Sequence, residues 1–234
     1  MWPLFTAMAL APIIGLVAWW VSTLDRLDPE ALAKLGASRG WSVQPTRDDD
    51  EEAVTLAPND GRWTIRVSRR IPRGGQGTKV SRSGGLRTVW QAAVPCPKGV
   101  LAIRPGEGPK GQLAPSPDML AWLFARAIEE MTGATMEELG GLDLLARIET
   151  GDAKFDDGFV AVGTNPALAA FLATPAQRSA VEAACATGAA VILSPAGLRL
   201  AVAGKVLSDG AKLDAMLAAG ERLRAAWEDG HDSD

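Results

Sequence analysis

Three short motifs combine residue types that could perform chemistry. The first, Gly36-Ala-Ser-Arg-Gly40, has the spacing of a nucleophile elbow, in which a serine sits between a strand and a helix. The elements expected around it come in the opposite order, a helix and then a strand. A serine nucleophile also needs a base, and the single histidine, His231, lies in the last residues of the chain. The motif therefore indicates the end of a helix.

The second motif, Gly74-Gly-Gln-Gly-Thr-Lys79, resembles a phosphate-binding loop. In such a loop the lysine directly follows a glycine and a helix begins with Ser or Thr behind it. Here Thr78 separates the glycine from Lys79, and the next expected element is a strand. The pattern favours a flexible hairpin loop.

The third motif, Asp152 with Asp156, Asp157 and Gly158, approaches a calcium loop, but the alternating oxygen ligands and the final glutamate are missing. Turn and helix-cap roles are favoured instead. With one histidine and two distant cysteines, no zinc-binding set can be assembled, and we expect neither a metal nor a cofactor.

The two cysteines, Cys96 and Cys185, are expected to be small buried residues rather than reactive thiols. Their number suits a reducing compartment, but the sequence leaves open whether they form a disulfide.

A basic stretch is the feature that points most directly to binding. Residues 61–104 contain ten Lys or Arg and no Asp or Glu, whereas residues 48–52 are all acidic. Either the acidic run balances this charge, or the basic side chains bind an anionic headgroup, a nucleic acid or an acidic partner. The net charge of −4 argues against nucleic acid. The candidate contacts are Arg66, Arg69, Arg70, Arg73, Lys79 and Arg82.

Residues 1–24 carry no charged side chain and are long enough to cross the ~30 Å apolar core of a bilayer as a helix. Trp2 at one end, with Trp19 and Trp20 at the other, is predicted to lie at the membrane interfaces. The segment lacks the basic start and the cleavage site of a signal peptide, which favours an uncleaved anchor. The positive charges that follow it predict that the large domain lies in the cytoplasm.

The remaining pattern predicts an α+β protein. Trp63, Ile65 and Val67 alternate with polar residues and predict a strand with one buried face. Proline directly after Asp28, Asn165 and Thr174 predicts helix starts. The expected parts are a transmembrane helix over 1–24, a juxtamembrane helix over 25–40, a β-rich lobe with an antiparallel meander over 41–115, a lobe over 116–228 with a helix pair and then a mixed β-α-α-β-β-α order, and a disordered tail over 229–234.

The motif Phe155-Asp-Asp-Gly-Phe159, followed by Leu172-Ala-Thr-Pro175, resembles a family of bacterial membrane-anchored proteins of unknown function. Their soluble domain carries a Phe-Asp/Glu-x-x-Phe element and then a Leu-x-Thr/Ser-Pro step. This chain has Ala161 where such proteins often have valine, and one predicted anchor where they often have two. The resemblance implies a cytoplasmic face and assigns no catalytic residue.

Taken together, these observations predict a non-enzymatic, single-pass membrane protein that acts as an interaction or accessory subunit for a protein partner. The alternative is a module that binds anionic lipid or another polyanion through the basic hairpin 62–87. A third hypothesis, an enzyme with an unfamiliar carboxylate site, is the least favoured, because the sequence pattern does not bring other functional residues together with the carboxylates.

Overall fold

The computed structural model describes residues 27–49, 51–71, 86–96, 98–106, 146–203 and 210–231. Within them the chain is α+β, as predicted, and its strands form one nine-stranded sheet in the order β1-β2-β3-β4-β9-β8-β5-β7-β6. All the paired strands described are antiparallel. The strands are β1 (Ser42–Arg47), β2 (Glu51–Ala57), β3 (Trp63–Arg70), β4 (Leu86–Ala92), β5 (Leu101–Pro105), β6 (Ala146–Arg147), β7 (Phe159–Gly163), β8 (Ala190–Ser194) and β9 (Gly197–Ala203).

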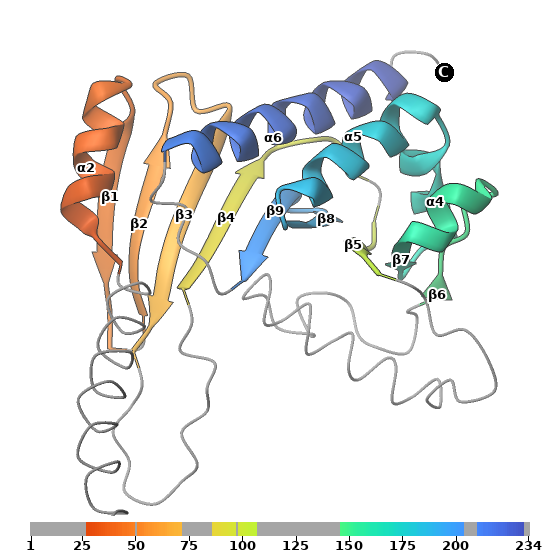
Figure 1. Cartoon of the computed structure of the whole chain (residues 1–234), viewed down its shortest axis with the longest axis horizontal. Helices are drawn as coiled ribbons and strands as arrows, with labels where there is room; N and C mark the ends of the chain where they lie inside the picture. Colours follow the sequence, from red (N-terminus) through yellow and green to blue (C-terminus); the bar gives the residue numbers. More distant parts are fainter. Residues whose placement is uncertain are drawn as a thin grey trace, which may run out of the picture.

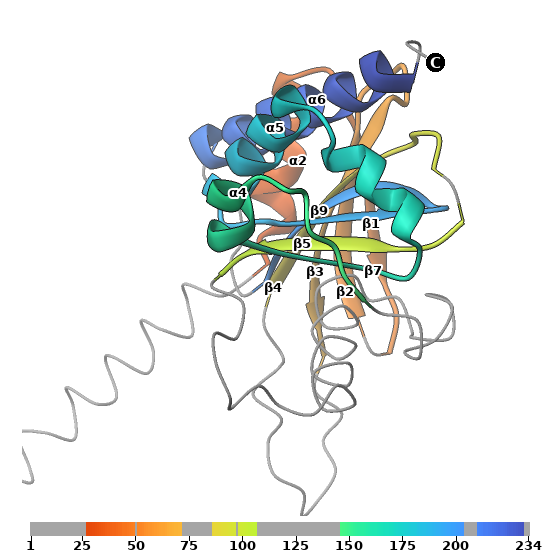
Figure 2. The same cartoon turned by 90° about the vertical axis from the view of Figure 1, so that its right-hand side faces the viewer.

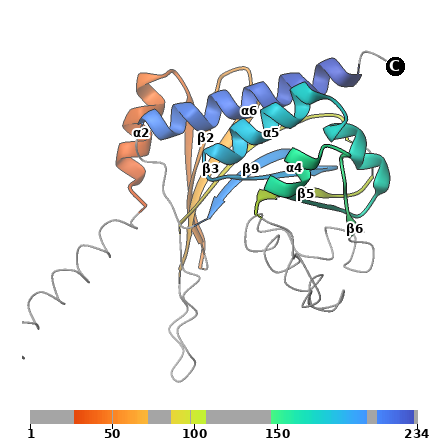
Figure 3. The ribbon, with the colours of Figure 1, turned by 45° about the vertical axis from the view of Figure 1, so that its right-hand side comes forward.

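The helices cover one face of this sheet (Figure 1). The sheet twists strongly, so that β1, β2 and β3 run across the direction of β5 and β7 (Figure 2). Figure 3 shows α6 lying alongside α5 across the sheet. The helical elements are α2 (Pro29–Ser38), α4 (Ala153–Gly158), the 3-10 helix η1 (Pro166–Leu172), α5 (Pro175–Ala186) and α6 (Gly210–His231).

The predicted helix starts are confirmed, and each has a side-chain cap. Asp28 accepts a hydrogen bond from the backbone N–H of Ala31 at 2.9 Å, and Asn165 accepts one from that of Ala167 at 3.0 Å. Thr174 and Gln177 form a reciprocal capping box at the start of α5. These caps satisfy backbone donors that have no partner inside the helix. The Gly36-to-Gly40 motif contains the end of α2, as expected.

The predicted meander is confirmed for β2, β3 and β4, and the turn at residues 59–61 joins β2 to β3. Trp63, Ile65 and Val67 are all buried, as their alternation predicts. The sequence predicts no strand at β1, because proline and polar residues interrupt its apolar pattern. β1 lies at the edge of the sheet, where Pro45 is tolerated and leaves the edge with one backbone donor fewer.

Several predictions need amendment or lie outside the described residues. The helix predicted to start at Asn165 is a 3-10 helix, and α6 continues to His231, three residues into the segment 229–234 predicted to be disordered. The strands of the two predicted lobes belong to one sheet, because β4 pairs with β9. The helix pair that follows residue 116 lies outside the described part of the chain.

The main core lies between the sheet and the helices and is built around Trp90 of β4, which is fully buried. Trp227 of α6 extends this core: its indole N–H donates to the carbonyl oxygen of Phe171 at 2.9 Å, and the two rings meet edge to face. Gly220 of α6 lies directly over Trp90. A β-carbon built on Gly220 would lie only 2.6–2.8 Å from three ring atoms of the indole. The helix can therefore approach β4 this closely only because residue 220 has no side chain.

Gly220→Ala is expected to lower the free energy of unfolding by about 1–3 kcal/mol, because the added methyl group must displace Trp90 or α6. Gly210→Ala, in the first turn of the same helix, is the matched control: its new β-carbon would meet only Arg39, at 3.8 Å. Urea unfolding followed by circular dichroism measures both. Equal stability of Gly220→Ala and wild type would contradict this packing.

Candidate functional site

The sheet face opposite the helices is polar over β2, β3, β4 and β9. Because side chains alternate along a strand, the residues between Trp63, Ile65 and Val67 point away from the core. They surround a hollow of about 300 Å³. We call it the sheet-face hollow, and it is lined by Glu51, Thr55, Thr64, Arg66, Ser68, Arg87, Val89, Gln91 and Arg199.

The strand register arranges this lining around Val89. Arg66 of β3 lies directly opposite Val89, and Ala201 of β9 lies on its other side. Arg87 and Gln91 flank Val89 along β4. Val89 is the apolar residue of the lining, and longer polar side chains from β2, β3, β4 and β9 surround it.

The rim is held in place by polar contacts at both ends. At one end, Arg66 Nη2 donates to Glu51 Oε2 at 2.7 Å, and both side chains are about one-third exposed or more. At the other end, the amide of Gln91 donates to the carbonyl oxygen of Ala196 at 3.0 Å, which fastens the β8–β9 turn to β4. Arg199 lies opposite Gln91 in the register and comes from this hairpin.

Glu51 is ionised more easily than an ordinary glutamate. Burial alone would raise its pKa, but hydrogen bonds from Ser68 and Arg66 and the charges of Arg66 and Arg87 outweigh burial and lower the pKa. The hollow thus contains three guanidinium groups and one firmly ionised carboxylate. Its excess of positive charge suits an anionic ligand.

The predicted basic contacts do not all lie on this face. Arg66 lines the hollow, whereas Arg69 falls on the other face of β3, because it is separated from Arg66 by an odd number of positions. In the register Arg69 lies opposite Glu52, and the backbone of Arg70 lies opposite that of Glu51. Glu51 and Glu52 of the acidic run therefore lie across from the basic strand β3. Charge balance by the acidic run was one of the two explanations that the sequence left open. The other predicted contacts, Arg73, Lys79, Arg82, Trp2, Trp19 and Trp20, lie outside the described residues.

The sequence did not assign Arg199 or Gln91 to the candidate site. Arg199 is far from the basic hairpin in the chain and reaches the hollow only through the β4–β9 pairing. The available signal is its position between Leu198 and Leu200, which are both fully buried, so that Arg199 must face the other side of the sheet.

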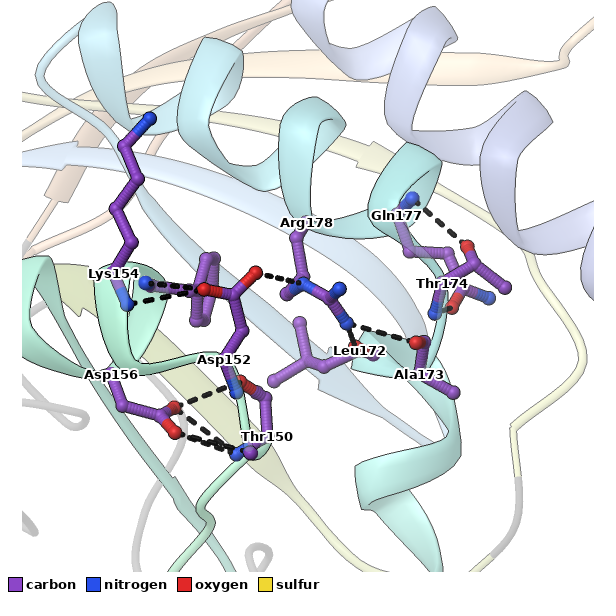
Figure 4. A network of polar contacts seen from close by, with 11 residues as sticks. Thr150, Asp152, Lys154, Asp156, Leu172, Ala173, Thr174, Gln177 and Arg178 are labelled. Atoms are coloured by element: carbon purple, nitrogen blue, oxygen red, sulfur yellow. Dashed lines mark hydrogen bonds and ion pairs between the residues drawn. The ribbon is translucent and has the colours of Figure 1, made fainter.

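The residues that carry the family resemblance form a second polar network, at the junction of α4 and α5 (Figure 4). Arg178 Nε lies 3.1 Å from Asp152 Oδ2, and Arg178 Nη1 donates to the carbonyl oxygens of Leu172 and Ala173, at 2.8 Å each. Asp156 accepts hydrogen bonds from the backbone N–H and the hydroxyl of Thr150. This network joins the turn before α4 to the end of η1.

The motif residues in this network have structural tasks. Phe155 is buried and stacks on Phe159, with ring centroids 4.8 Å apart. Asp152 is the N-cap of α4, which confirms the cap role predicted for these acids. In the part of the chain that the structure describes, no group of three or more His, Cys, Asp or Glu side chains could hold a metal ion.

Both cysteines are free. Cys185 lies buried in α5, and burial raises the pKa of its thiol to about 12. Cys96 is half-buried, and burial raises its pKa as well. Cys185 is therefore a small core residue, as predicted, and Cys96 is the more accessible of the two.

The comparisons with known proteins give one distant structural likeness. No protein-family model and no curated protein matches the sequence. The chain is similar to the crystal structure of the mycobacterial trehalose monomycolate transport factor A, TtfA, with 10% sequence identity and a TM-score of 0.47. The match covers 85% of this chain and 93% of that one. Among the described residues, no helix is both long enough and apolar enough to cross a membrane, and the predicted span 1–24 lies outside them.

Glu51→Gln is expected to destabilise the fold near neutral pH and to lose this effect in acid. Because folding lowers the pKa of Glu51, its ionised carboxylate stabilises the folded state at pH values above the pKa of this residue in the unfolded chain. This stabilisation disappears as the pH falls through the pKa of Glu51 in the folded state. Thermal unfolding from about pH 7 to about pH 3 measures the difference. In an Arg66→Gln background the pH dependence should shrink, since an ion pair and a hydrogen bond are already gone. A stability difference between Glu51→Gln and the wild type that does not change with pH would contradict the lowered pKa of Glu51.

Alkylation should distinguish the two thiols. In the native protein at about pH 8, iodoacetamide is expected to modify Cys96 first and to leave Cys185 unmodified, because Cys185 is buried and fully protonated at that pH. Mass spectrometry of peptides at successive times measures the two rates, and the urea-unfolded chain serves as the control in which both thiols react. Equal rates in the native protein would show that α5 does not bury Cys185.

Proposed function

We propose that this chain is a non-enzymatic accessory protein of the bacterial inner membrane. In this proposal residues 1–24 anchor it as a single span, the α+β domain faces the cytoplasm, and the side of the sheet opposite the described helices binds a protein partner. The observation that carries the proposal is the sheet-face hollow. One face of the sheet is occupied by helices, and the other presents half-buried guanidinium, amide and hydroxyl groups that suit recognition of another molecule.

The alternative proposal, binding of anionic lipid or another polyanion through the hairpin 62–87, is less well supported. A membrane surface attracts the sum of the nearby positive charges, and each contributes about 1 kcal/mol. The register sets Glu52 opposite Arg69, and Glu51 pairs with Arg66. These acids reduce the net positive charge that attracts the hairpin to a membrane surface. Binding in the sheet-face hollow depends instead on where the polar groups of its lining lie.

The test is mass spectrometry of what co-purifies with the tagged full-length protein from gently solubilised native membranes. We expect a stoichiometric protein partner with the wild type and its loss when Arg66 and Arg199 are both replaced by glutamate. Arg222→Glu is the control, since Arg222 lies on α6 and its side chain donates to Ser179 on the helix-covered side.

Two results would contradict the proposal. The first is a wild-type chain that purifies without any protein partner. The second is a purified chain that turns over a substrate and loses that activity when one residue of the hollow is replaced.

A further inference from the structure

We propose that the segment between β5 and β6, residues 107–145, packs on the sheet face opposite the described helices and covers the apolar part of that face. This inference does not depend on the proposed function. Three observations support it: a buried apolar cluster with no member in a described helix, the places where the chain leaves and re-enters the sheet, and the sequence of the segment itself.

A second apolar cluster lies on this face, beside the sheet-face hollow. Along β5, β7 and β8 its residues alternate with those of the main core, so they point to the opposite side of the sheet. Ala102 of β5 lies between Val162 of β7 and Ile192 of β8. Val89, in the lining of the hollow, packs against the cluster. The buried members are Val100, Ala102, Val160, Val162, Ile192 and Ala201.

These six side chains are buried more completely than a bare sheet face allows. None of them is more than 8% exposed, and none belongs to a described helix. The described helices lie on the other face of the sheet (Figure 1). Because an apolar sheet face is stable in water when another layer of the protein covers it, we infer that the cover comes from residues outside the described ranges.

The course of the chain favours residues 107–145 as this cover. They leave the sheet after β5 and return to it at β6, and the strand order β5-β7-β6 sets both ends beside β7. The other segments outside the described ranges fit less well. The hairpin loop 72–85 has one large apolar side chain, Val80, and residues 204–209 are few. The segment 1–26 leads into α2, which packs at the far edge of the sheet, on β1.

The sequence of the segment supplies a matching apolar surface. Ser116-Pro117-Asp118 predicts the start of a helix, and apolar residues follow at spacings of three and four. Such spacings put them on one side of a helix, while Arg126 and Glu129 fall on the opposite side. A helix of this kind buries its apolar side against a second apolar surface. The apolar stripe consists of Leu120, Leu123, Phe124, Ala127, Ile128 and Met131.

The proposal divides this face of the sheet into two parts. The chain itself occupies the apolar part over β5, β7 and β8. The part left open to another molecule is then the sheet-face hollow over β2, β3, β4 and β9.

The first test measures the reactivity of a thiol placed under the proposed cover. Ala102→Cys introduces a thiol among the apolar residues with little change in size, in the full-length protein purified in detergent without a partner. A maleimide labels accessible thiols, and mass spectrometry of peptides at successive times gives the labelling rate at position 102. Cys185, which is buried in the main core, is the internal control, because its protection shows that the fold is intact.

We expect the thiol at position 102 to react roughly a hundredfold more slowly than in the urea-unfolded chain. Phe124→Glu places a charge in the apolar stripe and should raise this rate by about tenfold, while Cys185 stays protected. Ala125→Glu is the matched control, since it adds the same charge away from the stripe and should leave the rate unchanged.

A second test needs no destabilising substitution. A photoreactive phenylalanine derivative in place of Phe124 is expected to crosslink to peptides of β5, β7 or β8 in the same chain, and the same derivative in place of Ala125 is not. Mixing ordinary and isotope-labelled chains distinguishes a crosslink within one chain from a crosslink between two.

Several results would overturn the inference. One is labelling at position 102 as fast as in the unfolded chain, and another is equal labelling in the two glutamate variants. Crosslinks from position 124 that miss these strands, or that join two chains, would overturn it as well, the latter because a second copy would then be the cover. Failure of the co-purification test would contradict the proposed function and leave this inference standing, because neither measurement here involves a partner.

Discussion

The antiparallel pairing of β4 with β9 holds the two halves of the chain in one sheet. Six residue pairs form it, from Arg87 opposite Ala203 to Ala92 opposite Leu198. On one side of this seam Trp90 and Leu200 pack under the helices, with Gly220 of α6 close against the indole. On the other side the same pairing sets Arg199 beside Gln91. The core and the candidate site therefore depend on one register, and a shift by one residue would exchange the faces of every side chain in the seam.

This constraint explains why charged groups can gather on the face of the sheet opposite the described helices. The helix-covered face contributes the main core, and the opposite face carries the polar residues of the hollow beside a smaller apolar cluster that includes Ala201 of β9, with Val89 of β4 packed against it. Val89 is the apolar residue of the lining, and the arginines come from the separate strands β3, β4 and β9. Hydrogen bonding between the strands fixes the positions of their backbones.

The local features of this fold follow from the sequence, and the long-range ones do not. The caps at Asp28 and Thr174 depend on residues within one helical turn, and the buried face of β3 depends on simple alternation, so both were predictable. The β4–β9 pairing joins residues more than a hundred positions apart, and no local pattern records it. For the same reason Arg66 could be named as a candidate contact, whereas Arg199 could not. Charge balance by the acidic run was one of two explanations for the basic hairpin, and only the strand register shows that Glu51 and Glu52 lie across from it.

The central claim, that the sheet face opposite the described helices is the binding face, is tested most directly by site-specific photo-crosslinking in intact membranes. A photoreactive amino acid would replace Thr64 at the hollow in one variant and Arg222 on α6 in a control variant. We predict that the probe at position 64 crosslinks one protein, identified by mass spectrometry, and that the probe at position 222 does not. Crosslinks to that protein from position 222 alone, or only lipid adducts from position 64, would contradict this claim.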